Sequence, residues 1–328
     1  GKIVERAVSQ ILSAGTIIRP VAHSMQVLVN PQGGAMQVDT LLKTEGYRSP
    51  VSLDFEAPGV LDFVTSLMVL RGGVKLGEGS SIELDALGGV VLNAQTVEVL
   101  GTIIAPGGSV SITGAGEFPS NTVPATAYAT VHLGPTARIS TAGKVVLLEN
   151  AYGRRVGTVH NGGTITVSGN IVAAAGAVLN VSGTTGMLDL LLQEAGVNEA
   201  VFAAGLTQAS IFPATGVTAP PRLALGSSVA TRSDSNAGSI SLKGSEFLFS
   251  AATLLGLAGG PNGQGGTLAV SSGRFIAPGA TRDDKDINLR VAQDISAFTQ
   301  PVFVPGQDVV GQALGGGMQI LSRGFRQI

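Results

Sequence analysis

The chain has 328 residues, of which 44% are hydrophobic, only 4% are aromatic and 47 are glycine. Its 20 basic and 22 acidic residues nearly cancel, so the sequence offers no basic face of the kind that binds nucleic acid. The absence of cysteine excludes disulfides and thiolate metal sites.

These proportions favour a thin, repetitive fold over a compact globule. A globular core is usually anchored by large aromatic side chains, whereas a narrow solenoid has room mainly for Val, Ile, Leu and Ala. The glycines follow no Gly-X-Y period, which excludes a collagen-like helix. The chain begins with Gly rather than Met, shows no signal peptide, and starts and stops within the pattern, so we expect a mature fragment or a piece of a longer protein. It has no apolar run of about 18 residues, so we expect no transmembrane helix.

Residues 1–50 are the least regular part of the sequence. Strand-like pieces occur at 16–18 and 26–29, and the run NPQGG at 30–34 is a strong turn signal. Because exposed strand edges invite aggregation, a cap over the open end of a tube is expected about as readily as an early coil. We therefore assign 1–50 as an irregular coil or cap region.

From residue 51 the sequence becomes periodic, and residues 88–116 show the repeating unit most clearly. They read GGVVLNAQTVEVLGTIIAPGGSVSITGAG, in which short alternating strands are separated by corners of Gly, Asn and Pro. Val, Ile and Leu at alternate positions fill a narrow interior, and Gly allows tight corners. The Gly doublet returns after nineteen residues. A short unit that must stack to bury its apolar face predicts a coil of a parallel β-helix.

We expect this β-helix to run over 51–275, with residues 276–328 forming a last coil and a tail. The predicted excursions from it are residues 114–130, 184–222 and 259–263, where prolines, glycines and polar residues break the rhythm. Within the second excursion, residues 187–204 form the one stretch with helix-like spacing of leucines, although Gly196 and Val197 weaken that interpretation.

At about 20–25 residues per coil, the chain would make roughly 12–15 coils. Stacked about 4.8 Å apart, these would form a rod on the order of 60–70 Å long. Parallel crossover connections are almost always right-handed. The predicted fold class is therefore all-β, a right-handed parallel β-helix (solenoid) with loop excursions.

Four segments resemble the shaft repeats of filamentous-haemagglutinin-like proteins, which are large adhesins exported by two-partner secretion. The segments are GGVVLNAQTVEVLGTIIAPGGSVSITG from residue 88, GGTITVSGNIVAAAGAVLNVSG at 162–183, VSGTTGMLDL at 181–190 and the run at 233–272. The resemblance covers about residues 70–275. The resemblance implies an extracellular or bacterial cell-surface location and an outer-membrane transporter for export.

The sequence departs from this family at one motif. The secretion domains of these proteins carry paired NPNL and NPNG motifs, and the nearest match here is the single Asn30-Pro31-Gln32-Gly33. The resemblance therefore implies an internal shaft segment rather than an export module. Its partners would be neighbouring segments of the same large protein, further copies of itself, or a host or surface glycan or protein.

Catalytic and metal-binding candidates are sparse. Asp54 and Glu56 lie two residues apart and so on one face of a strand, where two acids could act as acid and base, hold a cation, or simply be solvated. The run 283–286 (DDKD) is the densest charged cluster, but it lacks the turn and spacing of a calcium loop. We expect no metal and no cofactor.

The remaining candidates are histidines and one basic, aromatic cluster. His132 and His160 could lie on neighbouring coils but have no evident metal or triad partner, and His23 is isolated. Tyr152, Arg154 and Arg155 form the one concentration of aromatic and basic residues, and we assign them as a possible partner contact.

The sequence as a whole predicts a non-catalytic structural or adhesive rod, with its loops as the likelier contacts. Two alternatives stay open at this point. A β-helical polysaccharide lyase or hydrolase would need a groove lined by several acids and bases. A trimeric fibre or spike would need an apolar stripe along the outside of the rod.

Overall fold

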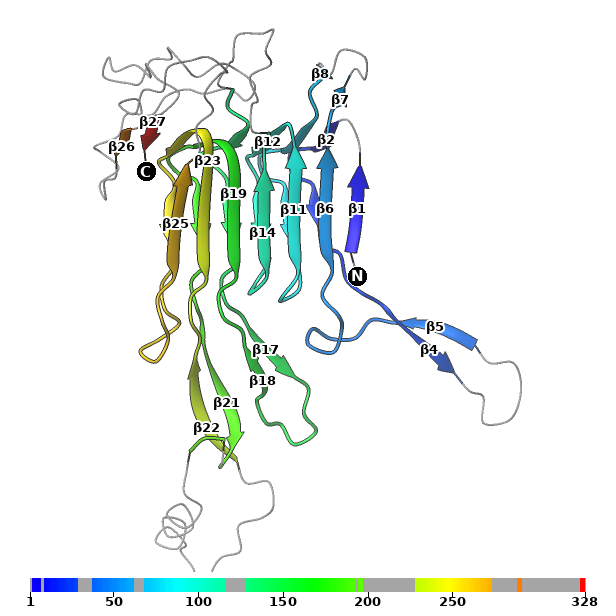
Figure 1. The fold of residues 1–328 in the computed structure, drawn as a ribbon. Helices are drawn as coiled ribbons and strands as arrows, with labels where there is room; N and C mark the ends of the chain where they lie inside the picture. The colour runs from blue at the N-terminus through cyan, green and yellow to red at the C-terminus, as the bar shows by residue number, and fades with distance from the viewer. Residues whose placement is uncertain are drawn as a thin grey trace, which may run out of the picture.

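The computed structural model describes residues 2–6, 9–28, 37–61, 68–115, 128–192, 194–196, 228–272, 288–290 and 325–327. This part of the chain is all-β, and most of its strands pair in parallel (Figure 1). No helix long and apolar enough to cross a membrane occurs among these residues.

The helix considered for residues 187–204 is wrong where the structure describes it. Met187 to Leu191 belong to β21 (Thr185–Leu191), which pairs in antiparallel register with β22 (Ser228–Asp234). The helix-like spacing of the leucines did not decide the conformation, because a partner strand about forty residues away satisfies the backbone groups of β21. Residues 197–204 lie outside the described part of the chain.

The parallel strands form three stacks. The first stack contains β1 (Lys2–Arg6), β6 (Ser52–Ala57), β11 (Gly89–Ala94), β14 (Ser109–Thr113), the first half of β19 (Thr164–Ala173), the first half of β23 (Ser239–Ser250) and β25 (Thr267–Ser272). The second contains β2 (Ser9–Leu12), β9 (Gly73–Leu76), β12 (Thr96–Val99), β15 (Val131–Leu133), the second halves of β19 and β23, β27 (Phe325–Gln327) and β26 (Asn288–Arg290). The third contains β3 (Ile17–Ile18), β10 (Ser81–Glu83), β13 (Thr102–Ile104), β16 (Arg138–Ser140), β20 (Val178–Asn180) and β24 (Thr253–Leu255). Residues 2–18 thus contribute one strand to each stack.

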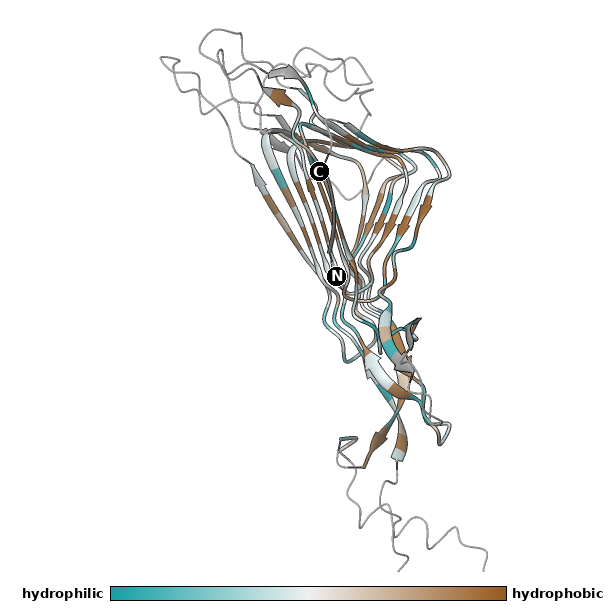
Figure 2. Cartoon of the chain, turned by 90° about the vertical axis from the view of Figure 1, so that its right-hand side faces the viewer, coloured by the Kyte–Doolittle hydropathy of each residue, from teal (hydrophilic) through white to brown (hydrophobic). Residues whose placement is uncertain are grey.

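The register of these stacks aligns aliphatic side chains into columns, which make the core. In the first stack Val90, Val110, Ile165 and Ile240 are successive register partners, and all are buried. In the third stack Ile82, Ile103, Ile139 and Leu179 form the matching column. Figure 2 shows the sheets from the side, joined at one end of the wedge and converging at the other. The buried aliphatic side chains of the three stacks belong to one continuous core.

Glycines allow the close approach of successive strands at one corner. Gly88, Gly108, Gly163 and Gly238 lie one above another, and a Cβ atom added to any of the last three would collide with the carbonyl oxygen of the preceding glycine in this row. The next amide beyond each corner donates to the same carbonyl, as Thr164 does to Gly108 at 2.9 Å. The Gly doublets of the sequence thus mark this corner.

Antiparallel ribbons leave the stacks as arms. Three of them follow strands of the third stack, and Figure 1 shows them on the lower side of the molecule. They are β4 (Ser24–Leu28) with β5 (Gln37–Leu41), β17 (Val145–Leu148) with β18 (Val156–Val159), and β21 with β22. A fourth ribbon, β7 (Val60–Leu61) with β8 (Met68–Leu70), follows β6. Because these arms use much of the chain, the described first stack has seven strands rather than the predicted 12–15 coils.

Candidate functional site

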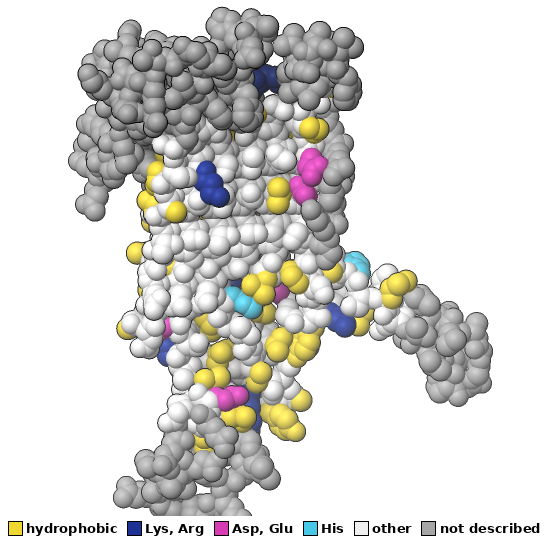
Figure 3. All heavy atoms as spheres, viewed as in Figure 1, with side chains coloured by type: hydrophobic (Ala, Val, Ile, Leu, Met, Phe, Trp, Pro, Cys, Tyr) yellow, Lys and Arg dark blue, Asp and Glu magenta, His cyan; other side chains and the backbone are white. Residues whose placement is uncertain are grey.

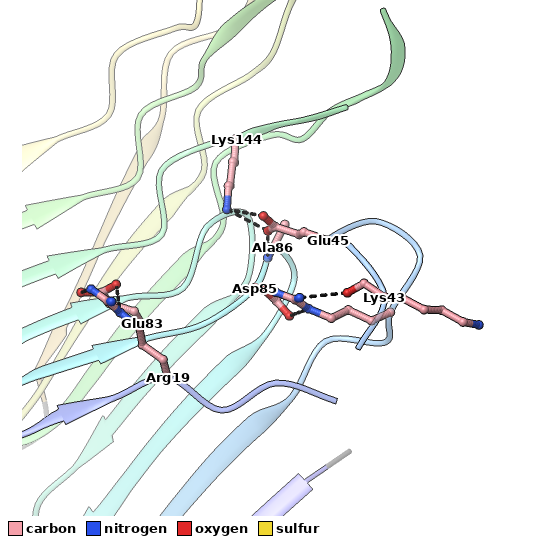
Figure 4. A network of polar contacts seen from close by, with 8 residues as sticks. Arg19, Lys43, Glu45, Glu83, Asp85, Ala86 and Lys144 are labelled. Carbon is pink, nitrogen blue, oxygen red and sulfur yellow. Dashed lines mark hydrogen bonds and ion pairs between the residues drawn. The ribbon is translucent and has the colours of Figure 1, made fainter. Parts of the chain in front are cut away.

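Residues 42–50 link the β4–β5 arm to β6 and are fixed by a bidentate ion pair (Figure 4). The Arg48 guanidinium donates to both carboxylate oxygens of Asp85, each at 2.6 Å, and to the carbonyl of Lys43 at 3.0 Å. The Arg48 and Asp85 side chains are only 15% and 11% exposed. The hydrogen bonds that Arg48 donates to the Asp85 carboxylate are the main cause that raises the pKa of Arg48. This pair holds the segment against the corner between the third and first stacks.

A second ion pair joins the same segment to the next arm. Lys144 Nζ donates to both oxygens of Glu45, at 2.6 and 2.8 Å, and the amide of Ala86 donates to Glu45 at 2.9 Å. Lys144 lies immediately before β17, ninety-nine residues from Glu45. Glu45 therefore ties together three parts of the chain that are distant in sequence (Figure 4).

A cavity of about 220 Å³ lies between this segment and the β17–β18 arm. Its lining includes Glu45, Arg48, Asp85 and His160, together with the apolar side chains of Leu87, Val146 and Leu148. Leu87 has a positive φ of 69°, which is unusual for a residue other than glycine. The carboxylates of Asp85 and Glu45 form ion pairs with Arg48 and Lys144. His160 also lines this cavity, and its ring has no partner among the described residues.

A more open cavity of about 480 Å³ lies beside the same segment. It is lined by Leu42, Lys43, Thr44, Tyr47 and Glu149. The Tyr47 hydroxyl donates to the carbonyl oxygen of Glu149 at 3.2 Å, three residues before Tyr152.

Tyr152 is 84% exposed at the tip of the β17–β18 arm, and the Arg154 guanidinium lies 5.8 Å from the centre of its ring. Two of the three tyrosines of the chain thus lie on adjacent loops, each beside a basic residue. We call Lys43, Tyr47, Tyr152 and Arg154 the tyrosine rim. Figure 3 shows hydrophobic side chains gathered over the arms below the broad, weakly charged face of the first stack.

Arg155, predicted with Tyr152 and Arg154, has a different role. Its side chain forms an ion pair with Asp189 of β21 at 2.9 Å, and its amide donates to the same carboxylate at 2.7 Å. These hydrogen bonds hold the pKa of Asp189 below its usual value. Arg155 therefore joins the β17–β18 arm to the β21–β22 arm.

The histidines do not meet. His132 lies in β15, whereas His160 follows β18 and lines the smaller cavity. His132 is the register neighbour of Glu98, which is also the neighbour of Lys75, and Glu98 contacts His132 Nδ1 at 3.4 Å and Lys75 Nζ at 2.7 Å. Hydrogen bonding by His132, and then Lys75, lowers the pKa of Glu98 to about 2. Sequence analysis missed this row, although each member stands between two aliphatic residues of a short strand and so could have been aligned.

The other predicted residues do not converge on a site. Asp54 and Glu56 both lie in β6, but their neighbours in β11 are Val91 and Asn93, so no further acid joins them there. His23 is exposed, and residues 283–286 lie outside the described part of the chain. Within that part, no three His, Asp or Glu side chains are grouped so that they could hold a metal ion.

Comparisons with known proteins identify no relative of this chain. No family model, no curated protein and no solved structure matches it.

Proposed function

We propose that the three stacks are the sides of a right-handed parallel β-helix. Support comes from the constant parallel register within each stack and from chain order, because each coil contributes a strand to the first, second and third stack in turn. The handedness follows from the strong preference of parallel crossovers for the right-handed sense.

We further propose that this helix is a non-catalytic structural or adhesive segment of a large exported bacterial surface protein. The similarity of residues 88–114, 162–183 and 233–272 to filamentous-haemagglutinin-like shafts supports it. The observation that carries an adhesive role is the tyrosine rim, because Tyr and Arg are enriched among the residues that contribute most to binding at protein interfaces. The Glu45 and Arg48 ion pairs hold the segment that carries Tyr47, which lowers the cost of ordering it upon binding.

The adhesive role is tested with beads coated with the full chain and a panel of immobilised glycans and extracellular-matrix proteins. Beads carrying the Tyr152→Ala, Arg154→Ala double variant should lose the binding shown by the unmodified chain. Lys243→Ala, which alters the outward face of the first stack, is the matched control and should bind normally. Binding that the double variant leaves unchanged, or no binding to any panel member, would refute the role of the rim.

Export is tested separately on the source cells. If the chain belongs to a surface protein, protease added to intact cells should remove it. Peptide mapping of the released material should also assign residues 1–328 to a polypeptide many times heavier than 32.9 kDa. A native mass near 32.9 kDa with protection inside intact cells would contradict the proposal.

One observation favours the enzymatic alternative. The cavity of about 220 Å³ is lined by two acids, an arginine and a histidine. Both acids are engaged in ion pairs, which weakens their capacity to exchange protons. A glycan-cleaving activity predicts new reducing ends or unsaturated products from a polysaccharide panel, lost in His160→Ala. No product from any polysaccharide tested would remove this alternative.

A further inference from the structure

The C-terminal end of the first stack leaves core side chains exposed. Leu268 and Val270 in β25 are register partners of Ile240 and Leu242 in β23, so they occupy the same inward positions one coil later. Ile240 and Leu242 are 3% and 2% exposed, whereas Leu268 and Val270 are 51% and 39% exposed. All six residues of β25 are exposed. Among the described residues, no strand covers the aliphatic column at this end of the stack.

The backbone of β25 is also open on that side. Among the described strands, β25 pairs with β23 alone (Figure 1). An open edge of this kind is a template for a further strand, and proteins usually protect such edges with charged residues. The sequence of β25 is TLAVSS, without a charge, whereas the opposite end strand, β1, reads KIVER. The two ends of the stack therefore differ in their suitability for contact with another strand.

We propose that β25 is a dimer interface, at which two copies of this chain meet end to end about a two-fold axis. A two-fold axis along the normal to the first sheet reverses the strand direction, so β25 pairs with its counterpart in antiparallel fashion. Centred on Ala269, this pairing sets Leu268 opposite Val270 of the other copy, Thr267 opposite Ser271, and Ala269 opposite itself. Aliphatic side chains then meet on the inner face and small side chains on the outer face.

The second copy is the occupant that these observations favour. The interface would continue the β23–β25 ladder and its aliphatic column, so the buried apolar surface extends an established one. No charge lies on β25 to oppose its own copy. An isologous two-fold contact joins two copies and then stops. A head-to-tail contact between β25 and β1 would bring the charged residues of KIVER into the new sheet and would continue into a filament. This inference does not depend on the proposed adhesive function, and it concerns the chain of residues 1–328. In a longer shaft, the next strand of the same protein would compete with the second copy for the edge of β25.

Sedimentation of the full chain tests the dimer. The mass should change with concentration, from 32.9 kDa towards twice that value, and hydrogen exchange at residues 267–272 should slow as the dimer forms. Val270→Lys should leave a monomer at every concentration. Thr166→Lys, on the outward face of the same sheet between Ser111 and Ser241, is the control and should dimerise normally.

Cysteine cross-linking tests the register and does not depend on how Val270→Lys folds. Because the chain has no cysteine, each introduced thiol is unique. Directly opposed residues of antiparallel strands have Cα atoms about 4.5–5.5 Å apart, within reach of a disulfide. Ala269→Cys should therefore give a disulfide-linked dimer under mild oxidation, and Ser241→Cys, one strand inwards, should not. A monomer at all concentrations, equal cross-linking of both variants, or open-ended filaments would overturn the proposal.

Discussion

At the scale of single residues, two buried threonines differ in the hydrogen bonding of their hydroxyl groups. Both Thr130 and Thr141 are fully buried in the stacks. The Thr130 hydroxyl accepts a hydrogen bond from the amide of Asn170 at 2.9 Å, whereas the Thr141 hydroxyl has no partner among the described residues. A buried polar group without a hydrogen bond costs free energy, so the same residue type should stabilise one site and weaken the other.

Replacing each threonine by the isosteric valine separates these two cases. Thr130→Val leaves the Asn170 amide unsatisfied and should lower the free energy of unfolding by about 1–3 kcal/mol. Thr141→Val removes an unsatisfied hydroxyl and should leave that free energy unchanged or raise it by up to about 1 kcal/mol. Urea unfolding followed by circular dichroism measures both, and equal losses for the two variants would contradict this explanation.

At the scale of the elements, the corners and the linking segment determine how strands and arms lie together. The glycine corner is a steric requirement, because successive carbonyl groups occupy the space that a side chain would need. The segment 42–50 depends instead on charge, since Arg48 and Glu45 connect it to Asp85 and Lys144. Each feature predicts a distinct response to mutation.

Gly163→Ala should destabilise the stack, because the new Cβ atom would collide with the carbonyl oxygen of Gly108. Overpacking of this kind typically costs about 1–3 kcal/mol, and more where backbone must move. The control is Gly265→Ala, whose Cβ would lie 3.7 Å from the Gly256 carbonyl oxygen, at an ordinary van der Waals distance. Its effect should stay within about 0.5 kcal/mol in the same unfolding assay. A tolerated Gly163→Ala would argue against close corner stacking.

Arg48→Met should release the segment 42–50, because it leaves the half-buried carboxylate of Asp85 without its cation. Loss of a hydrogen-bonded charged partner costs roughly 1.5–3 kcal/mol, and hydrogen exchange should quicken across 42–50. Arg19→Met breaks the similar Arg19–Glu83 pair, whose side chains are 62% and 32% exposed. Solvent screens exposed ion pairs, so this control should change the free energy of unfolding little. Equal effects would show that burial of the Arg48 pair is unimportant.

At the scale of the whole molecule, the stacks align side chains from strands that are distant in sequence. The row Lys75, Glu98 and His132 links three such strands, β9, β12 and β15. Glu98 has a pKa of about 2 in the folded chain, lowered from 4.5. A carboxylate whose pKa is lowered by folding stabilises the fold at pH values above its pKa in the unfolded chain. This contribution is lost as the pH falls through its pKa in the folded chain.

The free energy of unfolding should therefore fall between about pH 4.5 and pH 2, in part through Glu98. Glu98→Gln should lower stability at pH 7 and flatten this part of the pH dependence, because Gln cannot titrate. Denaturant titrations at pH 7, 4.5 and 3 measure the difference. A Glu98→Gln curve parallel to that of the unmodified chain would refute the assignment.

The sequence by itself determined the all-β class and the mainly parallel strands. Alternating Val, Ile and Leu between Gly corners can bury their apolar faces only by stacking, so local pattern and fold agree at residues such as Val90, Val110 and Ile165. The Tyr152 and Arg154 pair was also visible, because its members lie two residues apart and meet across a turn.

Only the tertiary structure decided where strands separated by arms meet and which charges pair. Glu45 forms an ion pair with Lys144, ninety-nine residues away, and Arg155 forms one with Asp189 of the neighbouring arm. The strand β21 pairs with β22 instead of forming a helix. The length of each arm sets these distances along the chain, and no local pattern encodes that length. The physical reason is that a long loop adds little to the free energy of closing it, so many pairings are open to the sequence and long-range packing selects one.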